Sequence, residues 1–232
     1  AFRTDTAADK NGQGTYVYEP EEPLDGPIIK DRLLKGETTV TADDTHAEDG
    51  YVSAAYNGDD SITVDMANHG LRLDAASSAS AKAVAVRGGK GTDGNKKSIS
   101  FINKEKNKPL VISADQTNGR EATGIYVSEN GKLSVAGDVV IDKVSTSGRM
   151  AYGVANRGPN AELIIKGGLK IAGTGADEWR TVKAAKDTTG ISVTAIANIG
   201  NNAKLTIEGP LDVKIQVTAF NSTAKGGVMR LG

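Results

Sequence analysis

Aliphatic residues occupy every second position in three similar ten-residue segments of the second half of the chain. The segments are KLSVAGDVVI at 132–141, ELIIKGGLKI at 162–171 and KLTIEGPLDV at 204–213. Residues two apart lie on the same side of an extended chain, and helical spacing fits none of the three segments. Each segment is therefore predicted to form two short strands joined at a glycine corner. The corner residues are Gly137, Gly167 and Gly209, where glycine would accept a positive φ without a Cβ clash.

The same alternation returns earlier in the chain with a loop in place of the glycine corner, in SITVDMANHGLRLDA and SISFINKEKNKPLVISA. A further strand is predicted before each of the five pairs, in GYVSAAY, KAVAVRG, TGIYVSE, AYGVANR and ISVTAIAN. GVMRLG, which begins at residue 227, would open a sixth unit. The units differ in length, as expected for a solenoid whose corners carry loops.

These repeats predict an all-β fold. Residues 50–232 are expected to form a right-handed parallel β-helix (solenoid) with three strands per coil and about five coils. A single coil leaves its backbone groups unpaired above and below, whereas stacked coils pair them and place Leu on Leu and Ile on Val. Two asparagine pairs occupy matching positions, Asn156 with Asn198 and Asn160 with Asn202. They are interpreted as internal or corner ladders, with a ligand-binding pair as the alternative.

Residues 1–49 lie outside the repeat and are expected to be an irregular lead-in that helps to cap the β-helix, since an open terminal coil is an exposed sheet edge. Within this segment Asp25, Pro27 and Gly36 bracket PIIKDRLLKG in the manner of an N-cap, a first-turn proline and a C-terminal glycine, which favours a short helix. The first ten residues lack the apolar stretch of a signal peptide.

Composition narrows the chemistry that the chain can perform. Aromatic residues make up 4% of the sequence and hydrophobic residues 38%, so the core must be aliphatic. There is no cysteine, which excludes disulfides, thiolate metal sites and cysteine nucleophiles. No apolar run approaches the roughly 20 residues of a transmembrane helix, so no membrane insertion is expected.

Charge is distributed unevenly, and it supplies one candidate binding surface. Residues 1–60 hold 14 acidic and 5 basic side chains, whereas the rest of the chain holds 15 acidic and 23 basic ones. The stretch 87–108 includes Lys90, Lys96 and Lys97, which could dock an anionic partner or form a solvated loop pair. Phe101 is its only aromatic residue, which argues against base stacking and a nucleic-acid partner.

Other motifs point to no cofactor, metal or catalytic site. GKGTDG at 89–94 spells a GxGxxG motif, but SISFIN follows it instead of the helix that a phosphate loop needs. His46 and His69 have no metal-ligand partner at helical or hairpin spacing, and the acidic residues of 43–60 match no calcium-loop pattern. No nucleophile elbow is present, and the outward residues of the matching strands are mixed. The chain is expected not to be an enzyme.

The longest late insertion, residues 173–190, supplies a second candidate surface. Acidic residues lie early and basic residues late in it, an order that suits a short helix with Trp179 and Val182 on its apolar side. In one interpretation the only tryptophan covers aliphatic residues on the flank of the solenoid. In the other, Trp179 and Arg180 project as a partner-binding anchor, since both residue types are enriched at interface hot spots.

The LxVxGxVxI rhythm, together with GIYVSENGKL and YGVANRGPNAEL, resembles the passenger domains of bacterial autotransporters, the pertactin-like and AIDA-like right-handed β-helices. The resemblance covers residues 50–232, and secreted filamentous haemagglutinins are the second family it suggests. It implies a passenger fragment without its C-terminal membrane barrel, exported through the outer membrane to the bacterial cell surface or secreted. A GDSGS-like protease motif is absent.

The resemblance also implies a non-catalytic role, as an adhesin for a host cell-surface or matrix protein or glycan, or as a self-association module. Two alternatives stay open. One is a polysaccharide-cleaving β-helix enzyme, and the other is a purely structural stalk.

Overall fold

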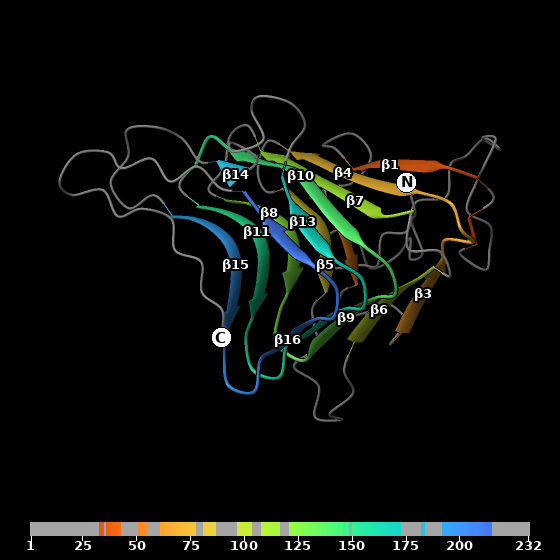
Figure 1. The fold of residues 1–232 in the computed structure, drawn as a ribbon. Coiled ribbons are helices and arrows are strands. Elements are labelled where there is room, and N and C mark those ends of the chain that lie inside the picture. The colour runs from red at the N-terminus through yellow and green to blue at the C-terminus, as the bar shows by residue number, and fades with distance from the viewer. Residues whose placement is uncertain are drawn as a thin grey trace, which may run out of the picture.

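Strands account for every regular element of the described part of this computed structural model (Figure 1). The structure describes residues 33–34, 36–42, 51–54, 61–77, 81–86, 97–103, 108–116, 121–148, 150–172, 182–183 and 192–214. Within these ranges the fold is all-β, as predicted. No helix in them is long and apolar enough to cross a lipid bilayer.

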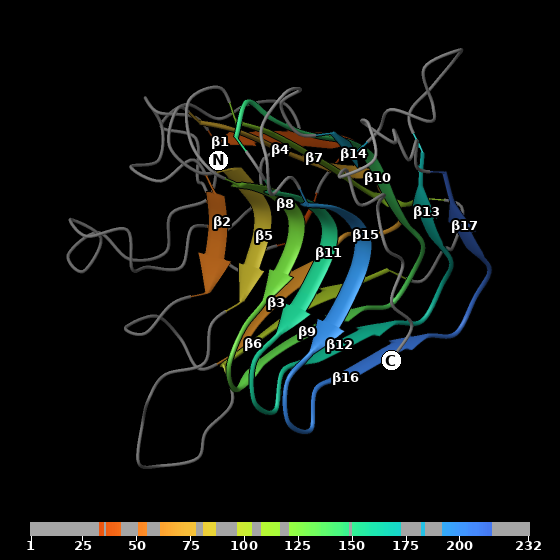
Figure 2. The same cartoon turned by 90° about the vertical axis from the view of Figure 1, so that its left-hand side faces the viewer.

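The strands form three parallel sheets, best distinguished in Figure 2. The first sheet contains β2 (Tyr51–Ala54), β5 (Ala81–Val86), β8 (Glu121–Val127), β11 (Met150–Arg157) and β15 (Ser192–Ile199). The second contains β3 (Ser61–Asp65), β6 (Lys97–Ile102), β9 (Gly131–Val135), β12 (Glu162–Ile165) and β16 (Lys204–Ile207). The third contains β1 (Thr38–Ala42), β4 (Leu71–Ser77), β7 (Leu110–Gln116), β10 (Val139–Thr146), β13 (Leu169–Ile171), β14 (Val182–Lys183) and β17 (Leu211–Val213).

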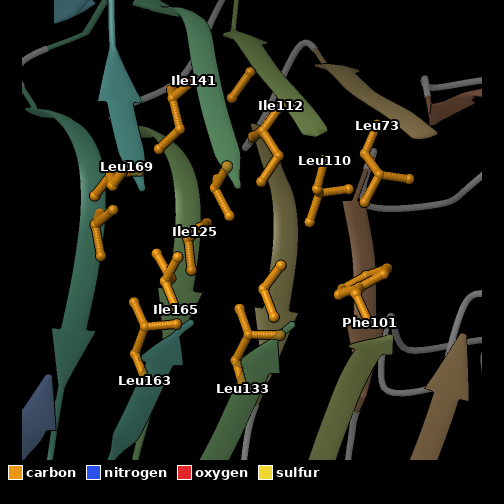
Figure 3. Packing of buried hydrophobic residues seen from close by; sticks show 14 of the residues in the cluster. Leu73, Phe101, Leu110, Ile112, Ile125, Leu133, Ile141, Leu163, Ile165 and Leu169 are labelled. Atoms are coloured by element: carbon orange, nitrogen blue, oxygen red, sulfur yellow. The ribbon is translucent and has the colours of Figure 1, made fainter. Parts of the chain in front are cut away.

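Five successive strand triplets, from β2–β3–β4 to β15–β16–β17, each give one strand to each sheet. The predicted stacking of like side chains is confirmed by the register. Leu163 pairs with Leu133 on one side and Leu205 on the other, and Ile165 pairs with Val135. Parallel pairing in register places identical positions one above another, so each aliphatic position becomes a column through the stack. Figure 3 shows these columns between the sheets.

The columns form one hydrophobic core whose burial changes along the stack. Leu133, Leu163 and Ile165 are at most 1% exposed, as the alternation predicted. In the last triplet the corresponding positions are only partly covered, and Leu211 is 41% exposed. Full burial of an aliphatic side chain contributes about 1.5–3 kcal/mol, so the central triplets supply more of the stability than the last one.

The glycine corners are present, but the reason expected for them was wrong. Positive φ occurs at Gly158 and Gly200 and at none of the three corner glycines. The requirement for glycine is instead close stacking, because the Gly167 N–H donates to the Gly137 carbonyl at 3.1 Å and the Gly209 N–H donates to Gly167 at 2.9 Å. A Cβ on Gly209 would lie 2.5 Å from the carbonyl carbon of Gly167.

Asparagine ladders connect neighbouring triplets, as predicted. Asn156 is fully buried, and its Nδ2 donates to Asn198 Oδ1 at 2.7 Å and to the Lys204 carbonyl at 3.0 Å. At the corner, Asn202 Nδ2 donates to Asn160 Oδ1 at 3.4 Å, and Asn160 Nδ2 donates to Asn130 Oδ1 at 3.1 Å. All three corner asparagines have φ between 56° and 60°, a conformation that asparagine tolerates better than most residues. The ladders are therefore structural.

Replacing Asn156 by Ala is expected to lower the free energy of unfolding by about 1–3 kcal/mol, because it leaves buried acceptors without a donor. Chemical denaturation of both proteins measures the difference. Asn201 lies on the surface of the same corner region, and Asn201→Ala is the control, with an expected change within about 0.5 kcal/mol. Equal effects of the two substitutions would contradict the ladder's contribution.

Part of the predicted lead-in pairs with the first triplet, at the edge of the stack that it was expected to help cap. Strand β1 pairs in parallel with β4 from Thr38 to Ala42, so part of the predicted lead-in belongs to the third sheet. The prediction of a helix in PIIKDRLLKG is wrong at Leu33 and Leu34, which pair with Asp65 of β3. Leu33 forms a parallel bridge with Asp65, and the Leu34 N–H donates to the Asp65 carbonyl at 2.8 Å. Residues 27–32 lie outside the described residues.

The insertion at 173–190 contains a strand at a position where a helix was expected. Val182 and Lys183 form β14, which pairs with Val144 and Ser145 of β10. Strand β10 is longer than β13, so its far end leaves backbone groups that β14 can pair. Val182 is 2% exposed and packs on the core, so its side chain supports the sheet.

Glu37 connects β1 to the turn before β4 and gives the stack an acid-sensitive contact. Lys108 Nζ donates to Glu37 Oε1 at 3.0 Å, and the Gly70 N–H donates to Glu37 Oε2 at 2.7 Å. The hydrogen bond from Lys108, followed by the one from Gly70, holds the pKa of Glu37 below its ordinary value of 4.5.

A depressed pKa makes this contribution to stability complete above the unfolded-state pKa and removes it as the pH falls. The melting temperature of the protein is therefore expected to decrease more between about pH 5 and pH 3 than that of Glu37→Gln. The difference should be small, because the Glu37 side chain is 61% exposed. If the melting temperatures of the two proteins fall equally as the pH is lowered, the stabilising contact of Glu37 is contradicted.

Candidate functional site

The first sheet faces the viewer in Figure 2. Strand pairing places two rows of side chains in register on the outer side of this sheet. Tyr126 lies between two core residues of β8, so its ring points outward. In register with it, Ala155 of β11 pairs with both Tyr126 and Ala197 of β15. A parallel row contains Tyr152, paired with Thr123 and with Thr194 of β15.

Two alanines of the first row are covered by other side chains. Ala155 and Ala197 point away from the core, yet they are 0% and 2% exposed. Neither belongs to the core cluster. Larger side chains on the outer face must therefore cover them. Beside these covered alanines, the outer face of the sheet holds a depression.

The depression is an open groove of about 410 Å³, called the outer groove below. It is lined by Glu121, Tyr126, Arg157, Gly158, Ile199 and Gly200, from β8, β11, β15 and the corners that follow β11 and β15. Ile199 is 47% exposed at one side of it. Because the lining comes from three consecutive triplets, the groove crosses the strands of the first sheet.

Charge in the outer groove comes from Arg157 and Glu121. The guanidinium carbon of Arg157 lies 5.7 Å from the centre of the Tyr152 ring, within the range of a cation–π contact. The Glu121 carboxylate accepts a hydrogen bond from the hydroxyl of buried Thr123 at 2.8 Å. Arg157 and Glu121 line the same groove without forming an ion pair with each other. Both charged groups therefore keep hydrogen-bonding capacity toward a ligand.

The binding residues predicted from sequence lie elsewhere or outside the described part of the chain. Trp179, Arg180, Lys90 and Lys96 are outside the described residues. Lys97 begins β6 of the second sheet and pairs in register with Gly131, so its backbone belongs to a different sheet from the outer groove. The basic stretch and the tryptophan loop stay predictions.

The segment after the GxGxxG motif is a strand, as the sequence indicated. SISFI lies within β6, whereas the motif itself, at 89–94, is outside the described residues. In the part of the chain that the structure covers, no group of three or more His, Asp or Glu side chains is placed to hold a metal ion. His69 lies in the turn between β3 and β4, where its backbone N–H donates to the Met66 carbonyl at 2.8 Å. His46 and the acidic residues at 43–49 and 59–60 are outside the described residues.

Sequence reasoning missed the outer groove, although a signal for it was present. Tyr126 and Arg157 occur in the segments that carry the family resemblance, and both were interpreted only as parts of the repeat. Aligning the first strands of the triplets places Tyr126, Ala155 and Ala197 in one outward row. The same alignment places Arg157 beside Ile199, which also line the groove. No family model, curated protein or solved structure that was compared with the chain matches it.

Proposed function

We propose that the strand triplets wind as a right-handed parallel β-helix and that the chain is a passenger fragment of a bacterial autotransporter. The support is the combination of stacked triplets in three parallel sheets, the column of close-packed glycines and the asparagine ladders. A cysteine-free chain also suits export across membranes in an unfolded, uncrosslinked state. In this proposal the protein acts at the bacterial cell surface or as a secreted protein.

The proposed role is non-catalytic binding, either adhesion to a host cell-surface or matrix protein or glycan, or self-association. The observation that carries it is the outer groove, which presents an aromatic ring and both signs of charge on a regular hydrogen-bonded scaffold. Side chains held on paired strands keep their positions, so little conformational entropy is lost when a partner binds.

A binding screen tests this role. The purified protein would be applied to host epithelial cells, matrix-protein surfaces and a glycan array, and its own association would be followed by analytical ultracentrifugation. Saturable binding to one of these, or concentration-dependent self-association, is the expected result. Failure in all of them would favour the stalk over the adhesin.

The polysaccharide-cleaving alternative is worth a separate assay, because Glu121 places a carboxylate in the outer groove. Most glycosidases use a pair of carboxyl groups. Incubation with acidic polysaccharides would show depolymerisation if the enzyme proposal holds, and Glu121→Gln should then abolish it. Intact polysaccharides after prolonged incubation would support binding without cleavage.

A further inference from the structure

The guanidinium of Arg157 indicates which chemical group a ligand of the outer groove would carry. On the neighbouring sheets, Arg72 and Lys132 pair with carboxylates of other strands, with nitrogen–oxygen distances of 2.7 and 3.5 Å. Arg157 pairs with no carboxylate among the described residues and lies over the Tyr152 ring instead. A guanidinium presents a planar fork of N–H donors that matches a carboxylate. The groove therefore offers a position for one carboxylate of a ligand.

Glu121 adds a complementary acceptor at the same surface. Its carboxylate accepts the Thr123 hydroxyl, which orients it, and two carboxylate oxygens have room for further donors. A ligand that meets both groups must supply an anionic acceptor for Arg157 and a hydroxyl or amide donor for Glu121. Sugars with a carboxyl substituent carry both on one ring.

Tyr126, which lines the groove, matches the apolar surface of a sugar. The aromatic face is electron-rich and attracts the polarised C–H groups of a pyranose ring. Ile199, which is 47% exposed, adds an aliphatic contact in the same groove. The lining comes from three neighbouring strands that together span about 10 Å, so the groove would contact a short segment of a linear glycan.

Other macromolecules fit this surface less well. Strands β8 and β11 are paired on both sides, so a peptide cannot add to them as a new strand, and of the three strands that line the groove only β15 lies at the end of the described sheet. A nucleic acid needs several cations along its phosphates, whereas the described lining of the groove contains one arginine together with a carboxylate.

We propose that the outer groove binds an extended glycan that carries carboxylate groups. Arg157 receives the carboxylate, Glu121 accepts a sugar hydroxyl, and Tyr126 packs against a ring face. This inference rests on the binding role proposed above and names the class of ligand for it.

Calorimetric titration tests the inference. The probes are hyaluronan and polygalacturonate octasaccharides and sialyllactose, and the control for each probe is the same sugar with its carboxyl groups reduced to alcohols. At least one acidic probe is expected to bind, and its reduced form should bind at least about tenfold more weakly, as for loss of one charge-assisted contact. Arg157→Gln and Tyr126→Ala should each weaken binding about tenfold. Arg157→Lys, which keeps the charge and loses the fork, should be intermediate.

Lys170→Gln is the matched control, because Lys170 is exposed on β13 of the third sheet and should leave affinity unchanged. Unaltered melting temperatures would show that the groove variants are folded. The inference is overturned if no acidic probe binds better than its reduced form, or if Arg157→Gln binds like the wild type. Cell or matrix binding that persists in Arg157→Gln and Tyr126→Ala would reject the groove and leave the adhesin role standing.

Discussion

Replacing Leu163 by Asp is expected to unfold the central triplets of the stack. Leu163 is completely buried, between Leu133 and Leu205 in one column. An aspartate there would place an unpaired charge in the aliphatic core, at a cost of about 3–5 kcal/mol or more. For a domain of this size the melting temperature should fall by about 10 °C or more. Thermal unfolding followed by far-UV circular dichroism measures it.

Leu205→Asp is the matched control, since it changes the same column one triplet further along. Leu205 is only partly buried, so its charge keeps contact with water and the expected loss is about 1–2 kcal/mol. Equal losses at the two positions would contradict the difference in burial along the stack. An unchanged melting temperature for Leu163→Asp would contradict the core itself.

Replacing Gly167 by Ala is expected to destabilise the stack although it adds a single methyl group. A Cβ at this position would lie 2.5 Å from the Asp138 backbone nitrogen, and backbone atoms below the corner cannot move without separating two triplets. Overpacking of this kind costs about 1–3 kcal/mol. Denaturant titration of the variant gives the value.

Gly137→Ala tests the same corner without the clash. The triplet before it turns through a loop instead of a glycine, and the nearest atom to an added Cβ is Asn103 Cβ at 3.9 Å. This substitution should be neutral within about 0.5 kcal/mol. A loss as large as that of Gly167→Ala would mean that backbone conformation, and not stacking distance, requires glycine at these corners.

The alternation of aliphatic and polar residues was sufficient to predict the strands of the five triplets and their partners. Leu133, Leu163 and Leu205 could be aligned from the printed sequence because a strand has a period of two residues and each triplet repeats the same period. A shift of one residue would turn every aliphatic side chain to the solvent, so the pattern itself fixes the register. The asparagine columns followed from the same alignment. Asn130 could also have been predicted, because it precedes Asn160 by the same 30 residues that separate Leu133 from Leu163.

Features that depend on which strands are long enough to pair could be decided only by the tertiary structure. Strands β1 and β14 joined the third sheet because β4 and β10 had backbone groups to pair with them, and no local pattern shows this. Nor does the sequence show how closely Gly167 lies above Gly137. The outer groove depends on the same three-dimensional stacking. Tyr126, Arg157 and Ile199 are far apart in the sequence, and they meet because parallel pairing places three first-sheet strands side by side. The sequence by itself therefore determined the strands of the five triplets and the aliphatic core, because both follow from a local period, whereas the proposed binding surface arises from the stacking of triplets.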